Sequence, residues 1–172
     1  MSVISKAKAG DEEAFTQLIQ EYKLSMYKTA KAILNNEDDV CDAIQDALIS
    51  IYQNLDTLKS EKYFKTWAIR ITINKCYDII KKSNSKDKEI SKLEEKSEEE
   101  ENITLKTDLE RALSLIDNDL KMVTVLYYYN DISVKEIADI LEIPVGTVKS
   151  KLSRAREKLY DILRQEEVDA RG

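Results

Sequence analysis

Side chains that can bind a polyanion are concentrated in one short segment near the C-terminus. Between Pro144 and Lys158 five cations accompany a single anion, Glu157, within a chain of 172 residues whose formal net charge is −6. Each neutralised phosphate releases condensed counterions, so basicity confined to one segment of an acidic protein favours DNA binding over a merely solvated surface. The donors suited to phosphates and base edges are Thr147, Lys149, Ser150, Lys151, Ser153, Arg154, Arg156 and Lys158.

These donors need a helix that holds them on one outward side, and the surrounding sequence predicts a helix-turn-helix. Ser133 can cap a first helix, and Glu136 three residues later can close a capping box. The only proline, Pro144, is tolerated at the start of a helix, so a second helix is expected to begin near it. Apolar residues recur at helical spacing in the two helices, at Val134, Ile137, Ala138 and Leu141 and at Val148, Leu152, Ala155 and Leu159.

A second group of cations accompanies aromatic side chains between Tyr63 and Lys82. Counting Lys62, this segment has six cations and one anion. Aromatic rings can stack unpaired bases while cations follow the backbone, so the segment is a candidate site for a single DNA strand. The alternative is a core stripe at helical spacing, formed by Phe64, Trp67 and Ile71. We therefore expect Trp67 to be mainly packed and Tyr63 to be the contact residue.

A helix that should begin after Asn36 is crowded with acids in its first turns, namely Glu37, Asp38, Asp39, Asp42 and Asp46. Carboxylates near a helix N-terminus are favoured by the macrodipole, which accounts for the first three. Five acids without a cation exceed what capping needs, so a basic protein partner is weighed evenly against simple solvation. Its inward face is expected to hold Val40, Ile44, Ala47, Leu48, Ile51 and Leu55.

Composition predicts an all-α protein of two small helical domains joined by a flexible linker. The chain has three glycines and one proline, and its apolar residues recur at three-to-four spacing. Residues 81–106 are rich in Lys, Glu and Ser and have too few apolar side chains to bury a face. We therefore expect domains at 1–85 and 107–168, the latter a helix-turn-helix, with an acidic linker over 86–106.

Composition also argues against several kinds of site. The chain has no histidine, and Cys41 and Cys76 form no Cys-x-x-Cys pair, so no metal and no cofactor are expected. Both thiols are expected to be reduced and inert, with a disulfide between them left open. No apolar run approaches the ~20 residues of a membrane span, and the first ten residues lack a signal-peptide core, which favours a cytoplasmic protein without membrane insertion.

The chain as a whole resembles the extracytoplasmic-function sigma factors of bacterial RNA polymerase, the compact two-domain members of the sigma-70 superfamily. The resemblance rests on residues 37–55, 63–82 and 115–163, in the family's order, and above all on the run IPVGTVKSKLSRAREKL. Two departures keep the charge: Lys149 and Lys151 stand where arginines are common, and the acidic helix has Ala43-Ile44-Gln45-Asp46 where a Leu-Val-Gln-Glu type is usual. Lysine lacks the bidentate fork of arginine.

The resemblance implies a promoter-specificity subunit that binds rather than catalyses. The first domain would dock core RNA polymerase through Asp38, Asp39, Asp42, Gln45 and Asp46. It would hold the melted downstream promoter element with the loop and helix around Asp56 to Lys82, through Lys62, Tyr63, Lys65, Trp67, Arg70, Asn74 and Lys75. The second would bind the polymerase flap and the upstream promoter element through Thr147, Lys149, Ser150, Lys151, Ser153 and Arg154. The family also implies monomeric action and a membrane-anchored anti-sigma factor as partner.

Two other classes of protein remain open at this stage. A stand-alone helix-turn-helix regulator would share the last third of the chain, but its N-terminal part would need a ligand pocket or a phosphorylation site. A helical enzyme fits less well, because no glycine-rich phosphate loop and no ordered nucleophile and base are visible. Association with core polymerase separates the first two classes, since an ordinary regulator binds its operator without it.

Overall fold

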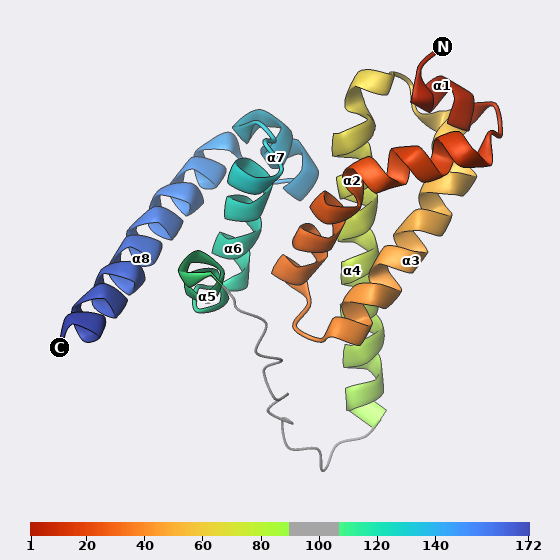
Figure 1. The fold of residues 1–172 in the computed structure, drawn as a ribbon. Coiled ribbons are helices and arrows are strands. Elements are labelled where there is room, and N and C mark those ends of the chain that lie inside the picture. The colour runs from red at the N-terminus through yellow and green to blue at the C-terminus, as the bar shows by residue number, and fades with distance from the viewer. Residues whose placement is uncertain (90–106) are drawn as a thin grey trace.

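The structure of this chain is a computed structural model that describes residues 1–89, with side chains up to Lys86, and residues 107–172. Within these ranges every regular element is helical, which confirms the all-α prediction (Figure 1). None of the described helices is both long and apolar enough to span a membrane.

The N-terminal half is a bundle of three long helices, α2 (Glu12–Ile33), α3 (Glu37–Asn54) and α4 (Phe64–Glu89), with the short α1 (Val3–Lys8) at one end (Figure 1). Asp11 caps α2 and Asn36 caps α3 through side-chain oxygens that accept backbone N–H groups. The expected apolar faces point inward, with Met26, Val40 and Ile51 fully buried. Two 3₁₀ turns, η1 (Leu55–Thr57) and η2 (Glu61–Tyr63), connect α3 to α4.

Helix α4 is longer than its composition suggested. We expected it to end near Lys82 and the linker to begin at 86, but the helix continues to Glu89. Once a helix is nucleated each further residue adds a hydrogen bond, and Lys, Asp and Glu need no buried face to continue it on an exposed surface. The rest of the expected linker, 90–106, lies outside the described residues.

The C-terminal half contains α5 (Asp108–Ser114), α6 (Asn118–Thr124), the π-helical turn η3 (Val125–Tyr129), α7 (Val134–Leu141) and α8 (Val145–Arg171). Thr107 and Glu110 form a capping box at the start of α5. Helices α5 and α6 pack against α8 around a small apolar cluster of Ala112, Ile116, Leu120, Ala155 and Leu159.

The two halves are packed together, which the sequence did not indicate. Helix α2 contacts α6 and η3, and α4 contacts α7. One buried apolar cluster includes residues from both halves, among them Met26, Ile69, Leu126 and Ile137. The two groups of helices therefore share a core, and a surface of one half can be covered by the other.

Candidate nucleic-acid interface

Helices α7 and α8 form the predicted helix-turn-helix. The Ser133 Oγ accepts the backbone N–H of Glu136 at 3.2 Å, and the Glu136 Oε2 accepts the backbone N–H of Ser133 at 3.1 Å, which confirms the capping box. Glu142 ends α7 in the left-handed region with φ 56, a conformation usually taken by glycine or asparagine. Pro144 is the N-cap residue of α8 rather than its first helical residue.

The apolar stripe of α8 is buried as predicted, through Val148, Leu152, Ala155 and Leu159. The opposite side presents four of the six predicted upstream contacts to solvent, namely Lys149, Ser150, Ser153 and Arg154, while Thr147 and Lys151 are half-buried. The first turn of α8 has no acidic residue, so the positive end of the helix dipole adds to the field of these cations. The six residues therefore lie on one helix beside a surface open to a duplex.

Three cations between Lys151 and Lys158 of α8 are held by groups of other elements in the same half of the protein. Lys151 pairs with Asp119, Lys158 Nζ lies 2.8 Å from Asp117 Oδ2, and Arg156 donates to the Tyr128 hydroxyl at 2.8 Å. The hydrogen bond from Lys151 lowers the pKa of the Asp119 carboxyl below its usual value. These contacts fix the cations in position and offset part of their charge, whereas Lys149 and Arg154 form no salt bridge among the described residues.

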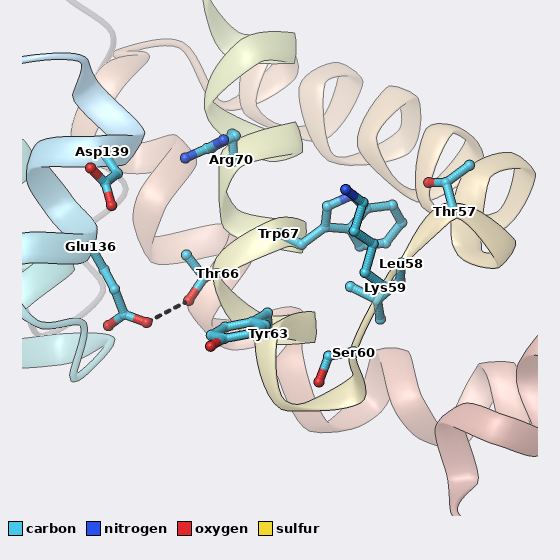
Figure 2. Close-up of a pocket in the computed structure, with 10 residues that line it drawn as sticks. All are labelled: Thr57, Leu58, Lys59, Ser60, Tyr63, Thr66, Trp67, Arg70, Glu136 and Asp139. Atoms are coloured by element: carbon cyan, nitrogen blue, oxygen red, sulfur yellow. Dashed lines mark hydrogen bonds between the residues drawn. The ribbon is translucent and has the colours of Figure 1, made fainter.

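The second predicted DNA site surrounds the start of α4. A cavity of about 390 Å³ lies there, and Figure 2 shows Tyr63, Trp67 and Arg70 along its wall. Tyr63 is 50% exposed, whereas Trp67 is half-buried against Phe64 with ring centroids 6.0 Å apart. As expected, Trp67 is packed and Tyr63 is the more accessible of the two. The remaining wall on this side comes from Thr57, Leu58, Lys59, Ser60 and Thr66.

Not every predicted strand contact reaches this cavity. The Lys62 Nζ lies 5.2 Å from the centroid of the Tyr63 ring and so stands at the rim. Lys65, Asn74 and Lys75 do not line it, although all three are at least partly exposed. The structure thus brings the aromatic side chains and Arg70 together and leaves the other cations along the outside of α4.

The opposite wall of the cavity is acidic and belongs to α7. Glu136 and Asp139 both line it, and in Figure 2 their carboxylates face Thr66, Tyr63 and Arg70. The Thr66 hydroxyl donates to the Glu136 Oε1 at 3.4 Å, a long hydrogen bond. Glu136 therefore caps its own helix through Oε2 and contacts the N-terminal half of the protein through Oε1.

The acidic residues of α3 are largely available for a partner. Glu37 is engaged by Tyr27, whose hydroxyl donates to it at 2.7 Å, and by Lys31 at 2.9 Å, and these contacts lower the pKa of its carboxyl. The other four acids form no salt bridge among the described residues, and Asp38, Asp42, Gln45 and Asp46 are exposed with Asp39 half-buried. On the same helix Ile49 is 55% and Tyr52 52% exposed. Charged and apolar groups thus share one outward surface.

Both cysteines are free in the structure. Cys41 is exposed on α3, and burial raises the pKa of the Cys76 thiol to about 12. The structure therefore has no disulfide between Cys41 and Cys76. No group of side chains suited to a metal ion is found among the described residues.

Sequence reasoning missed the residues whose role depends on contacts across the chain. The loop from Thr57 to Ser60 lies in the segment that the family resemblance implied for the downstream element, but no pattern in the sequence singled out these four residues as cavity wall. Glu136 was assigned only to helix capping, and Asp139 was given no role. No signal in the sequence reports which helix of one half will face which helix of the other.

The fold and these two sites define a class of helical nucleic-acid-binding protein with a helix-turn-helix and a separate aromatic and cationic cavity. Two family models match the chain: "Sigma-70 region 2" over residues 18–86 and "Sigma-70, region 4" over residues 106–159. The SigW extracytoplasmic-function (ECF) RNA polymerase sigma factor of Bacillus subtilis (strain 168) is 30% identical, over 94% of this chain and 95% of that protein. The chain belongs to the ECF sigma factors.

Other relatives agree with this assignment. The ECF RNA polymerase sigma-E factor of Escherichia coli (strain K12) is 29% identical, over 91% of this chain and 90% of its own length. The sigma factor RpoE of Bartonella quintana, solved with the anti-sigma factor NepR, has the same fold with a TM-score of 0.67 and 23% identity, over 86% of this chain and 97% of that one. CnrH, solved with the cytosolic domain of CnrY, gives a TM-score of 0.65 at 23% identity, over 95% and 96% of the two chains. Because matches extend over both halves, a stand-alone regulator that shares only the last third is not favoured.

Proposed function

We propose that this protein directs core RNA polymerase to specific promoters and helps to melt them. The observation that carries the proposal is the presence in one chain of two different candidate DNA-binding surfaces, the exposed cationic side of α8 and the aromatic and cationic cavity at the start of α4. A duplex regulator needs only the first. A protein that also stabilises an opened strand needs the second.

In this proposal α8 enters the major groove of the upstream promoter element. Lys149, Ser150, Ser153 and Arg154 are exposed and would meet base edges, while Thr147 and Lys151 lie nearer the protein surface and would meet phosphates. Arg154 is the strongest candidate for base recognition, because its planar fork can bond two acceptors of guanine. The lysines would add affinity that depends less on sequence.

The cavity at the start of α4 would hold the downstream element once its bases leave the stack. Tyr63 offers an exposed ring for stacking, and the Lys62 ammonium over that ring adds a cation close to the backbone path. Arg70, also on the α4 side, lines the same cavity. Lys65, Trp67, Asn74 and Lys75 would extend or support this contact along α4.

The outward side of α3 would dock core polymerase. Asp38, Asp39, Asp42, Gln45 and Asp46 supply a negative surface that suits a basic partner, and the exposed Ile49 supplies an apolar contact beside it. Exposed apolar side chains within a charged surface are typical of a protein interface. The chain would act in the cytoplasm as a monomer until it binds polymerase, with its two domains at 1–85 and 107–168.

A membrane-anchored anti-sigma factor is the proposed inhibitory partner. The support is that the related RpoE was solved in complex with an anti-sigma factor. Such a partner would bind in place of promoter DNA or core polymerase. The chain itself would bind and position nucleic acid, and the polymerase would perform the chemistry.

The decisive experiment is reconstitution with core RNA polymerase. We expect the purified chain to form a complex with core enzyme and to enable transcription from a promoter chosen by sequence selection on the holoenzyme. Core enzyme alone is the control for promoter choice. A chain that binds its selected duplex equally well without core, and that does not associate with core, would instead be a stand-alone regulator.

A further inference from the structure

Helix α1 reaches the loop that forms part of the cavity wall at the start of α4. It lies at the end of the bundle where α3 passes into α4, and it contacts α2 and η1 (Figure 1). The Lys8 Nζ donates to the Leu58 carbonyl oxygen at 2.5 Å. The Ser5 hydroxyl donates to the Glu61 Oε1. We propose that Ser5 and Lys8 are positioning residues that hold this loop in the shape that receives the melted downstream element, so the proposal rests on the proposed function and deepens it.

The two contacts lie at opposite ends of the loop. Leu58 ends η1 and lines the cavity, and Glu61 begins η2, the turn that contains Tyr63. The intervening residues 59–60 also line the cavity. Because the chain is held at both ends, the path of the wall between them and the direction of the turn that presents the Tyr63 ring are restricted. A binding site on a loop needs such support, since a site held too loosely binds its ligand poorly.

The loop has few contacts of its own to fix it. Neither η1 nor η2 has a side-chain hydrogen bond at its N-cap, and 3₁₀ turns have poorer hydrogen-bond geometry than α-helices. The Leu58 side chain is buried, but Lys59 next to it is exposed. Segments with few buried apolar contacts open locally at low free-energy cost. Contacts from α1 therefore supply order that the loop lacks.

Helix α1 is itself firmly placed, so it can act as a support. Val3 and Ile4 pack against the main apolar cluster, and Ala7 is buried within it. Gly10 has φ 91, a conformation that favours glycine, and it turns the chain from α1 into α2. The Gly10 backbone N–H donates to the Ala7 carbonyl oxygen at 3.0 Å and closes the turn.

A chain of hydroxyl groups directs Ser5 toward the loop. The Ser2 hydroxyl donates to the Ser5 Oγ at 3.0 Å, which leaves the Ser5 hydrogen to be donated to Glu61. Hydrogen bonding by Ser5 first, and by Ser2 nearby, holds the pKa of the Glu61 carboxyl below its usual value. Glu61 is therefore an anionic acceptor at neutral pH, and hydrogen bonds to a charged acceptor are stronger than those between neutral groups.

The test compares holoenzymes that differ only in α1. Lys8→Met keeps the side-chain stem and removes the donor, and Ser5→Ala removes the hydroxyl. Lys6→Met makes the same change of side chain on the same helix, at an exposed lysine whose side chain forms no hydrogen bond or salt bridge within the described ranges. Each holoenzyme selects from randomised single-stranded oligodeoxynucleotides, and its affinity for the duplex upstream element is measured separately. Thermal unfolding of each isolated chain verifies the fold.

We expect Lys8→Met and Ser5→Ala each to reduce the preference for the selected strand over unrelated strands by roughly two- to tenfold, the effect of losing one hydrogen bond from the ordered loop. Affinity for the upstream duplex, which α8 alone would contact, should change little. Lys8→Arg and Ser5→Thr keep a donor and should retain most of the preference. Acrylamide quenching of Trp67, which lines the same cavity, should rise in Lys8→Met and not in Lys6→Met.

A double-variant cycle ties the effect of Ser5 to its contact. Glu61→Gln weakens the acceptor of the same hydrogen bond. Because both changes disrupt one interaction, Ser5→Ala with Glu61→Gln should lose no more preference than the larger single change. Additive losses would mean that Ser5 acts elsewhere, and they would overturn its assigned role.

Equal strand preference in the wild type and in both α1 variants rejects the role of α1 and leaves the proposed function in place. A loss in Lys6→Met as large as in Lys8→Met rejects it too, because charge alone would then explain the effect. Losses of the same size for strand and duplex would show a general defect and would also count against positioning. If the wild-type holoenzyme selects no strand and opens no promoter, the proposed function fails and the role of α1 fails with it.

Discussion

The two candidate DNA-binding surfaces of this chain differ in how they are built. The surface of α8 comes from one helix, its cap and its first turns, and its exposed residues Lys149 and Arg154 lie open to solvent. The cavity at α4 joins a loop, a helix start and a helix from the other half of the protein. A site made by one helix can be complete in the folded domain, whereas a site made between halves depends on how they are arranged.

The electrostatic surroundings differ in the same way. Acids near α8, such as Asp119, belong to the same half and hold cations in place without covering the outward side. Acids near α4 belong to α7 and face the binding groups across the cavity (Figure 2).

The largest expected effect is loss of binding to core polymerase. Without core polymerase neither the α8 surface nor the α4 surface would act in transcription, so the difference between them would disappear. Reversing Asp39, Asp42 and Asp46 to lysine should weaken association with core by at least about a hundredfold, because like charges placed across an interface cost several kcal/mol. Co-migration with core enzyme at two salt concentrations measures this, with circular dichroism to verify the fold. Glu157, Asp161 and Asp169 changed to lysine are the control, and equal losses in both triple variants would mean that the α3 surface has no special role.

The next largest effect should fall on the α4 surface alone. Holoenzyme with alanine at Lys62, Tyr63 and Lys65 should still find the promoter through α8 but open it poorly. Loss of a base–aromatic stack is worth about 1–3 kcal/mol, enough to reduce opening by roughly tenfold or more. Permanganate reactivity of promoter thymines measures the opened strand. Lys81→Ala with Lys82→Ala, on the same helix but away from the cavity, serves as the control, and normal reactivity in the triple variant would leave Tyr63 without a strand contact.

This contrast also explains what the sequence could predict. The helix-turn-helix followed from Ser133, Glu136, Pro144 and the apolar spacing, because caps and periodicity are local properties of the chain. The burial of Phe64 and the exposure of Tyr63 followed from helical spacing in the same way. The continuation of α4 to Glu89 did not, since an exposed stretch of helix is not fixed by an apolar face.

The cavity between the two halves is the part that local patterns could not supply. Thr29 and Asn130 are 101 residues apart in sequence yet share a buried hydrogen bond. Glu136 shows the same limit, because its capping role was visible in the sequence and its contact with Thr66 was not. Pairing between distant helices depends on side-chain packing over the whole interface rather than on any one segment. The roles assigned to individual DNA-contact residues stay predictions.

A smaller and more selective effect is expected at α8. Arg154→Ala should cost about 1–3 kcal/mol at the preferred site and relax preference at one or two base pairs, because it removes a donor to base edges. Selection of duplex sites with the variant holoenzyme measures both. Transcription from a premelted template, which would depend on the α4 surface, should be unaffected. A full-strength wild-type preference would assign base recognition to other side chains of α8.

The smallest effect concerns Lys151, which is paired with Asp119 and is proposed as a phosphate contact. Lys151→Ala should weaken all duplex sites alike and reduce the slope of log affinity against log salt by about 1. Asp119→Asn should do the reverse, since it leaves the lysine charge without its partner. It should cost less than about 1 kcal/mol of stability, because the Asp119 side chain is exposed and Lys151 is only half-buried. The pKa of Asp119 is lowered in the folded state, so the stabilising contribution is present at neutral pH and is lost as pH falls through that lowered pKa. Salt titrations of the two variants on selected and unrelated duplexes measure these shifts. A change confined to the selected site would mean that Lys151 contacts a base rather than a phosphate.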